Sequence, residues 1–284
     1  MGAAAGELPE GRGREFELSE AEYAEICALV RTHTGIALSD NKRELVYSRL
    51  TRRLRKLQLP GFRAYIELLA TGEPKELEEF TNAITTNLTA FFREDHHFEH
   101  LNDEVLPELA RKNAAARRLR IWSAGCSTGE EPYSIAMTLQ ENMALFPGWD
   151  VKILATDLDS NVVAHAAAGV YNPDRLDKMR PERLRTFFSQ NAGGQYKTAD
   201  CLKQLITFKQ LNLMHEWPMR GPFDIIFCRN VVIYFDKPTQ RGLFDRMANL
   251  QANGAYLFIG HSESLFKVTD RYKLIGRTIY QKVS

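Results

Sequence analysis

Residues 119–137 (LRIWSAGCSTGEEPYSIAM) have the types and order of a ligand-binding turn between a strand and a helix. An apolar run typical of a buried strand gives way to small residues at 123–129. Pro132 then stands in the first turn of a predicted helix, where its missing N–H costs nothing. Gly125 allows a ligand to approach bare backbone, and the free N–H groups at the start of the helix point toward that ligand. The stretch therefore predicts a binding site at the end of a strand.

An acid stands at the end of the next predicted strand. Residues 151–156 form that strand, and Asp157 follows it in the sequence KILATDLD. In a doubly wound α/β domain, an acid at this tip holds the two hydroxyl groups of a ribose. The turn and the acid together predict a nucleoside-containing cofactor, although glycine-containing turns are also common in α/β proteins that bind none.

The sequence of the turn favours one class of cofactor. The dinucleotide fingerprint G-x-G-x-x-G is absent, and Asp157 lies beyond the usual spacing of ~20 residues from the turn. Glu130 and Glu131 stand where a pyrophosphate would sit, and their carboxylates would repel it. Because they suit a ligand with a cationic part such as a sulfonium, the turn favours S-adenosylmethionine over NAD.

Polar residues also lie beside the later predicted strands. Asn212 and Leu213 precede the fourth strand, Arg229 and Asn230 follow it, and Tyr234 comes shortly after. The carboxyl ends of parallel strands share one edge of a sheet, so we expect these residues to gather beside the acid of the second strand. Each has an ordinary alternative, as a turn cap or a core aromatic, and only the joint pattern indicates a site.

The elements that position these residues divide the chain into two parts. Apolar residues recur at helical spacing over residues 18–84, which predicts an all-helical N-terminal domain behind a flexible tail at 1–17. Residues 85–118 are expected to form a linker and a helix. Strands then alternate with helices over 119–284, which predicts a mostly parallel α/β sheet with a small antiparallel β-subdomain at about 190–210.

The second predicted helix, residues 40–57, is strongly basic. A charged helix face is usually only solvated, and that alternative stays open. The functional interpretation is a docking surface for an acidic partner. Nucleic acid fits less well, since no aromatic residues interleave and the net charge of the chain is only +1. The predicted docking residues are Arg49, Arg52, Arg53 and Arg55.

The composition excludes several other classes of protein. Of 284 residues, 44% are hydrophobic, which supports a sizeable core, and no apolar run approaches the ~20 residues of a spanning helix. The N-terminus lacks the apolar segment of a signal peptide. The four cysteines are scattered without a C-x-x-C pair, which indicates reduced thiols and neither disulfides nor a metal site. We therefore expect a cytoplasmic monomer that does not insert into membranes.

Long stretches of the chain resemble the CheR family, the chemotaxis receptor methyltransferases of bacteria. The resemblance implies an all-helical domain followed by a Rossmann-like class I S-adenosylmethionine methyltransferase domain with an inserted β-subdomain. It implies methyl transfer to the γ-carboxylates of glutamates on chemoreceptor cytoplasmic helices, with S-adenosylhomocysteine as the product. Cys126 departs from the small inert residue common in the family, and is expected to make the glycine loop oxidisable. The matching segments are NLTAFFRE (87–94), WSAGCSTGEEPYSIAM (122–137), ATDLD (155–159), GPFDIIFCRNVVIYFDK (221–237) and HSES (261–264).

The resemblance also implies roles for single residues. Asn87, Thr89 and Arg93 resemble the linker residues that close over the cofactor, with Arg93 meeting its carboxylate or the incoming glutamate. Glu131 resembles a carboxylate near the methionine portion, and Tyr234 would lie near the methyl group. The remaining matches are Gly125 in the glycine loop, Asp157 as the ribose ligand, Asn212 and Leu213 beside the adenine, and Arg229 and Asn230 as the floor of the site.

Two other functions compete with this one. A non-catalytic S-adenosylmethionine sensor or scaffold would keep the pocket and lose the chemistry, yet Arg93, Asp157, Asn230 and Tyr234 are all present. A nucleic-acid methyltransferase acting on the amino groups of bases would carry N/D-P-P-Y/F after the fourth strand, where this chain has RNVV.

A glutamate carboxylate is already ionised at pH 7, so its methylation requires no general base.

Overall fold

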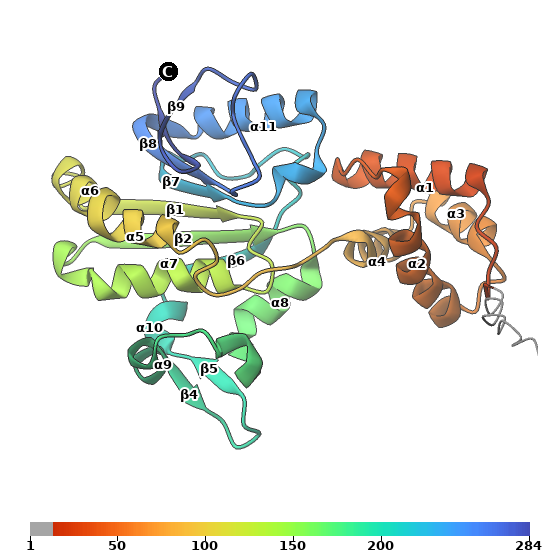
Figure 1. Ribbon diagram of the computed structural model, residues 1–284, viewed down its shortest axis with the longest axis horizontal. Helices are drawn as coiled ribbons and strands as arrows, with labels where there is room; N and C mark the ends of the chain where they lie inside the picture. Colours follow the sequence, from red (N-terminus) through yellow and green to blue (C-terminus); the bar gives the residue numbers. More distant parts are fainter. Residues whose placement is uncertain (1–13) are drawn as a thin grey trace, which may run out of the picture.

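The structure is a computed structural model and describes residues 14–284. A helical N-terminal part and an α/β part are joined by an irregular linker, residues 85–94, that runs between them (Figure 1). Most of the predicted tail, residues 1–17, lies outside the described residues. Its described end packs on the helical part, where the Phe16 N–H donates to the Tyr47 hydroxyl at 3.3 Å.

Four helices build the N-terminal part around an apolar core. The first begins with a capping box, in which Ser19 and Glu22 satisfy each other's backbone N–H groups, and ends at Gly35 in the left-handed conformation. Ile26 and Leu50 are fully buried between the helices. Nowhere in residues 14–284 does a helix have the length and apolar character that spanning a bilayer requires. The helices are α1 Glu20–Thr34, α2 Arg43–Leu57, α3 Phe62–Ala70 and α4 Pro74–Ile84.

The α/β part is built on a seven-stranded sheet with the order β6-β2-β1-β7-β8-β10-β9. The first five strands are parallel, and β10 and β9 complete the sheet as an antiparallel pair. The winding reverses between β1 and β7, which opens a crevice at their carboxyl ends and confirms the predicted α/β class. The strands are β1 Arg118–Ala124, β2 Asp150–Asp157, β6 Ile206–Gln210, β7 Phe223–Cys228, β8 Gln251–Ile259, β9 Tyr272–Gly276 and β10 Ile279–Lys282.

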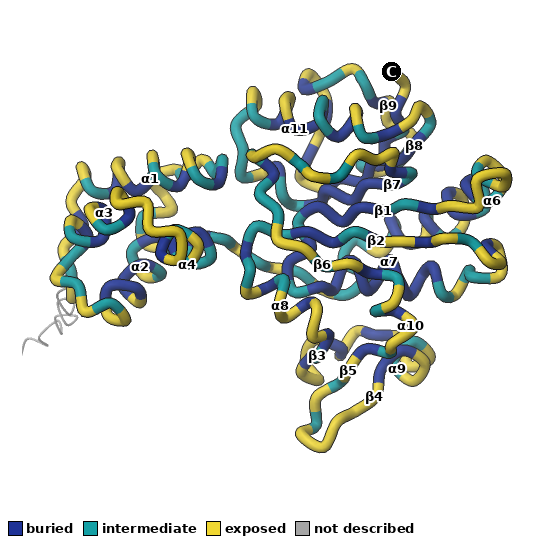
Figure 2. Tube along the Cα trace, turned by 180° about the vertical axis from the view of Figure 1, so that it is seen from behind, coloured by how far each residue is buried: buried dark blue, intermediate teal, exposed yellow. Residues whose placement is uncertain are grey.

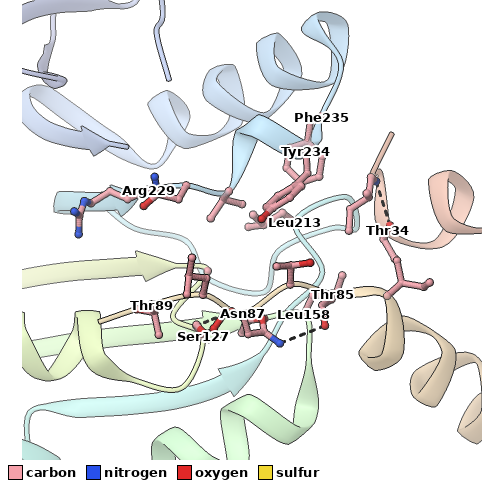
Figure 3. Close-up of a pocket in the computed structure, with 18 of the residues that line it drawn as sticks. Thr34, Thr85, Asn87, Thr89, Ser127, Leu158, Leu213, Arg229, Tyr234 and Phe235 are labelled. Carbon is pink, nitrogen blue, oxygen red and sulfur yellow. Dashed lines mark hydrogen bonds between the residues drawn. The ribbon is translucent and has the colours of Figure 1, made fainter. Parts of the chain in front are cut away.

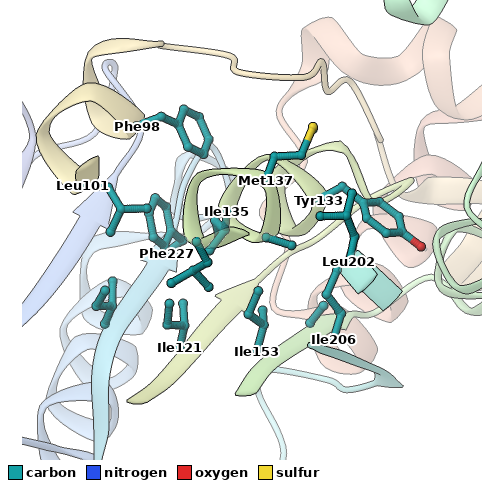
Figure 4. Close-up of a cluster of buried hydrophobic side chains, with 14 of the residues drawn as sticks. Phe98, Leu101, Ile121, Tyr133, Ile135, Met137, Ile153, Leu202, Ile206 and Phe227 are labelled. Atoms are coloured by element: carbon teal, nitrogen blue, oxygen red, sulfur yellow. The ribbon is translucent and has the colours of Figure 1, made fainter. Parts of the chain in front are cut away.

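Apolar cores cover both faces of this sheet. Side chains alternate along β1, so Ile121 packs with Phe227 under helix α7 (Figure 4), whereas Trp122 packs on the opposite face against helix α11. The strands are buried along the middle of the sheet, and exposed residues gather at its rim (Figure 2). The helices are α5 His96–His100, α6 Leu106–Lys112, α7 Glu130–Glu141, α8 Ser160–Ala168, α9 Pro181–Phe187, α10 Asp200–Lys203 and α11 Lys237–Asn249.

The small β-subdomain begins earlier in the chain than predicted. Its antiparallel sheet has the order β3-β5-β4, formed by Val170–Tyr171, Tyr196–Thr198 and Phe188–Gln190. The predicted range of about 190–210 wrongly included β6, which joins the edge of the main sheet parallel to β2, with Ile206 opposite Ile153. Periodicity alone does not decide between the two sheets for such a short apolar run, whereas pairing with β2 buries Ile206.

Candidate functional site

A cavity of about 230 Å³ lies between the helical part and the carboxyl ends of β1, β2 and β7 (Figure 3). The linker crosses one side of it, and the strand tips of the sheet form the other. All residues that the sequence marked as cofactor-binding or catalytic line this cavity: Asn87, Thr89, Arg93, Gly125, Glu131, Asp157, Asn212, Leu213, Arg229, Asn230 and Tyr234.

The turn after β1 exposes its backbone to the cavity because Gly125 has no side chain. Gly125 has a φ of 95°, and a Cβ at this position would collide with the Val231 side chain. The N–H groups of Gly125 and Cys126 both donate to the Thr156 carbonyl, at 2.8 and 2.9 Å, which ties the turn to the end of β2. The Cys126 thiol is buried, and burial raises its pKa, so the structure argues against the expected oxidation.

Asp157 presents a carboxylate at the tip of β2, next to the turn. It accepts hydrogen bonds from the backbone N–H groups of Ser127 at 2.7 Å and Asp159 at 3.1 Å. Each oxygen keeps a lone pair for a further donor. Burial raises the pKa of Asp157 to about 6, against the lowering effect of these hydrogen bonds. A carboxylate placed in this way can accept both hydroxyl groups of a ribose.

Glu131 belongs to a buried ionic cluster behind the turn. Its carboxylate accepts from Ser123 Oγ at 2.7 Å and from Arg229 Nη1 at 3.0 Å. Burial raises the pKa of Glu131, and the charge of Arg229 opposes this rise. Arg229 Nη2 also lies 3.4 Å from Glu94, so two carboxylates face one guanidinium. Of these two carboxylates, Glu131 lines the cavity, where it can face the cationic part of a ligand.

Glu130, the neighbouring acid, has a different role from Glu131. It forms an ion pair with Arg175, which also donates to the Thr89 carbonyl at 2.8 Å. Glu130 therefore supports the linker through Arg175 and does not line the cavity. The sequence could not show which of the two adjacent acids faces the cavity, because this depends on how the helix packs in the fold.

The linker is fastened across the cavity at several points. Asn87 Nδ2 donates to the Asp159 carboxylate at 2.8 Å. Ser127 Oγ donates to the Asn87 carbonyl at 3.1 Å (Figure 3). Arg93 Nη1 donates to the Leu88 carbonyl at 2.8 Å, which closes a short loop. Ser127 and Asp159 were not predicted, although Asp159 stands in the quoted ATDLD segment.

The helical domain forms the remaining wall of the cavity. Asn212 Nδ2 donates to the His33 carbonyl at 2.7 Å, and the Ala37 N–H donates to the Tyr234 carbonyl at 2.9 Å. The segment after α1 lines the cavity with Ile36 and Leu38 among others. No sequence signal marked this segment, because its contacts with the α/β part depend on how the two parts pack.

The basic residues of α2 lie outside the cavity and differ in exposure. Arg53 was predicted to dock a partner, but it is buried and pairs with Glu76 and Glu79 inside the helical domain. Arg49 is half-buried and donates to the backbone carbonyls at the end of α4. Two predicted docking residues, Arg52 and Arg55, are exposed, and Arg55 pairs with Glu15.

These features fit S-adenosylmethionine. An open glycine turn and the Asp157 carboxylate suit a nucleoside, and the apolar side chains of Leu158 and Leu213 line the same cavity. Of the two acids that the sequence assigned to a sulfonium, Glu131 lines the cavity and Glu130 does not. Arg229 Nε, furthermore, is a buried donor without an acceptor among residues 14–284, so the protein alone leaves it unsatisfied beside the cavity.

Known proteins match the chain over nearly its whole length. The family described as "CheR methyltransferase, SAM binding domain" matches residues 87–281, and "CheR methyltransferase, all-alpha domain" matches residues 21–85. The probable chemotaxis protein methyltransferase of Rhizobium etli is 47% identical, over 89% of this chain and 96% of the relative. Chemotaxis protein methyltransferase 2 of Pseudomonas aeruginosa is 44% identical, over 94% and 95%. The chemotaxis protein methyltransferase of Escherichia coli is 42% identical, over 93% and 91%.

These matches decide between the alternatives that the sequence left open. They support a catalytic protein over a non-catalytic sensor, and S-adenosylmethionine is its cofactor. The helical domain and the doubly wound sheet correspond to the two matched family regions, in the same order along the chain. The chain belongs to the CheR family of S-adenosylmethionine-dependent methyltransferases.

Proposed function

We propose that this protein transfers the methyl group of S-adenosylmethionine to the γ-carboxylate of glutamates on the cytoplasmic helices of bacterial chemoreceptors. The products are glutamate methyl esters and S-adenosylhomocysteine. One observation carries the choice of a carboxylate acceptor. Among the described residues that line the cavity there is no histidine or cysteine, and both acids, Glu131 and Asp157, already accept hydrogen bonds within the protein. Such a site suits a nucleophile that needs no general base.

The chemistry requires positioning more than proton transfer. A glutamate carboxylate is ionised at pH 7. When bound, S-adenosylmethionine supplies a methyl group on a sulfonium. A carboxylate oxygen forms a bond to that carbon while the carbon–sulfur bond breaks, and the sulfur keeps the electron pair. Holding two reactants in line can supply several kcal/mol, roughly 7–11 in the best cases.

Two residues at the cavity are suited to this positioning. Arg93 carries a fixed positive charge, and its guanidinium can hold the carboxylate of the substrate. Tyr234 lines the same cavity from the turn after β7 and can restrict the space around the methyl group. Because opposite charges on the reactants disappear during the transfer, a site that excludes water favours it.

Charge also supports a receptor helix as the partner. The relatives are named chemotaxis protein methyltransferases. We expect the receptor helix that accepts the methyl group to be acidic. The exposed Arg52 and Arg55 on α2 give this chain a basic face, whose charge is opposite to that of such a helix.

The proposal is tested with S-adenosylmethionine carrying a labelled methyl group and membranes that contain chemoreceptors. We expect label in the receptor band that is released as methanol by mild base, which distinguishes a carboxyl ester from an N-methyl group. Tyr234→Ala and Arg93→Ala should lower the rate by about tenfold or more, while Tyr196→Ala in the β-subdomain serves as the matched control. Base-stable label, or no label in the receptor, would contradict the proposal.

A further inference from the structure

Glu94 lies next to the cavity without lining it, and the mechanism above does not use it. It follows Arg93 directly in the linker, and its backbone has a φ of 58°, in the left-handed region. This conformation costs a residue with a side chain roughly 1–3 kcal/mol, so the surrounding contacts must hold it. Only 10% of the Glu94 side chain is exposed.

The Glu94 carboxylate connects segments that are distant in the sequence. His261, in the turn after β8, donates to it from the backbone N–H at 3.1 Å and meets it through Nδ1 at 2.8 Å. Asn230 Nδ2, at the tip of β7, donates at 3.4 Å, and Arg229 Nη2 lies 3.4 Å away. Arg229 also donates to the Arg93 carbonyl. One carboxylate therefore joins the linker to the floor of the cavity.

The surroundings of Glu94 keep it ionised. Burial opposes the charge, but the hydrogen bonds from His261 and the charge of Arg229 lower the pKa of Glu94 to about 2. His97 Nδ1 lies 3.6 Å from Glu94, and burial together with Arg229 lowers the pKa of His97 to about 3, so this ring is neutral at pH 7. Without Glu94, the Arg229 guanidinium would have Glu131 as its remaining carboxylate partner.

We infer that Glu94 is a positioning residue for methyl transfer, because its carboxylate fixes the linker against the tips of β7 and β8. It thereby sets where Arg93 stands at the cavity, whereas the Glu263 carboxylate holds the backbone N–H of Asn230 at 2.9 Å. The inference rests on the proposed function, in which Arg93 meets the incoming carboxylate. Positioning on this scale matters, since a misplacement of about 1 Å can cost roughly 100-fold in rate.

The test compares Glu94→Gln with Glu99→Gln, which makes the same chemical change at an exposed position of α5. We expect kcat to fall about tenfold or more in Glu94→Gln, while the calorimetric affinity for S-adenosylhomocysteine changes by less than about threefold. The melting temperature should stay within about 3 °C of the unmodified protein. Amide hydrogen exchange of residues 85–94 should be faster in Glu94→Gln and unchanged in Glu99→Gln.

A second variant, His261→Ala, removes the ring nitrogen that meets Glu94 and leaves the backbone N–H that also donates to it. It should also accelerate exchange in residues 85–94, and adding it to Glu94→Gln should have no further effect on kcat. Unchanged kcat and unchanged exchange in Glu94→Gln would overturn the inference. So would equal losses of kcat and product affinity, because Glu94 would then serve binding as a whole.

These readouts separate the inference from the proposed function. Should Glu94→Gln fail to fold, His261→Ala decides by the same kcat and exchange measurements. Should the unmodified protein not methylate receptor carboxylates, the proposed function fails, and exchange of the linker still decides whether Glu94 fixes it.

Discussion

At the scale of single residues, burial shifts the pKa values of the carboxyl groups in the site. Asp157 is held at the tip of β2 by two backbone N–H groups, and burial raises its pKa to about 6. We propose that Asp157 accepts hydrogen bonds from the ribose of the cofactor. Such donors favour the ionised carboxylate, so we expect cofactor binding to lower this pKa and release a proton. Affinity for the cofactor is thereby linked to pH near neutrality.

We predict that S-adenosylmethionine binds more tightly as the pH rises from 5 to 8. Because only ionised Asp157 accepts both hydroxyl groups, the affinity at pH 5 should be about tenfold weaker and should level off above pH 7. Isothermal titration calorimetry at each pH measures this directly. In Asp157→Asn the affinity should be weak at every pH, and a persisting pH dependence there would assign the proton to another group.

The strand-tip residues that the sequence assigned to the site line the cavity, whereas the sequence did not mark the residues that support them. Asp157, Arg229 and Asn230 follow strands, and strand order alone brings them to one edge of the sheet. Glu94 and the segment at 36–38 were not predicted as parts of the site. Their contacts depend on how the linker and the helical domain pack, which no local pattern encodes.

At the scale of elements, the cavity depends on a turn that only glycine forms without strain. Gly125 combines a φ of 95° with close packing against Val231. Sequence periodicity located this turn correctly, because small residues interrupt a strongly apolar strand. It did not assign β6, since a short apolar run fits the edge of either sheet.

Gly125→Ala should destabilise the fold by about 1–3 kcal/mol and abolish measurable cofactor binding, because the new Cβ must displace Val231. Gly242→Ala is the matched control. It lies inside α11 with open space around it, and should stabilise the protein by about 0.5–1 kcal/mol. Urea unfolding measures the free energy of unfolding of both variants. Similar values for the two would show that the turn does not require glycine at position 125.

The basic helix α2 divides into a buried part and an exposed part. Arg53 holds Glu76 within the helical domain, so its role is structural. Arg52 and Arg55 face solvent and are free to meet an acidic helix once Arg55 leaves Glu15. The sequence predicted the basic character of the helix but not this division, which depends on tertiary packing.

Charge reversal of Arg52 and Arg55 to glutamate should raise the KM for receptor several-fold and leave the affinity for S-adenosylmethionine unchanged, since neither residue lines the cavity. Kinetics at two ionic strengths should show that salt reduces the difference between the variant and the unmodified protein. Arg53→Ala, in contrast, should lose roughly 3–5 kcal/mol of stability, because it leaves a buried carboxylate unpaired. A drop in cofactor affinity upon charge reversal would argue against a docking role.

At the scale of the whole molecule, the cavity joins two domains. The helical part contributes Ile36 and Leu38 to the lining, and Asn212 and Tyr234 bind its backbone. Arg31 and Asp236 add an ion pair across the same boundary. A ligand in this cavity therefore contacts both domains at once, and we expect it to hold them together.

Cofactor binding should thus stabilise both domains. At a ligand concentration of about 100 times Kd, linkage predicts roughly 2.7 kcal/mol of added stability. Hydrogen exchange should slow in residues 34–38 as well as at the strand tips when S-adenosylhomocysteine binds. Protection confined to residues 119–284 would show that the helical domain does not close the site.

The chemical identity of the methylated group decides whether this protein is a glutamate methyltransferase. A receptor cytoplasmic fragment would be incubated with the protein and S-adenosylmethionine, and its peptides analysed by mass spectrometry before and after mild base. We expect single methyl groups on glutamate side chains that disappear after base treatment. Methyl groups on lysine or arginine, or any base-stable methylation of the receptor, would contradict transfer to a carboxylate.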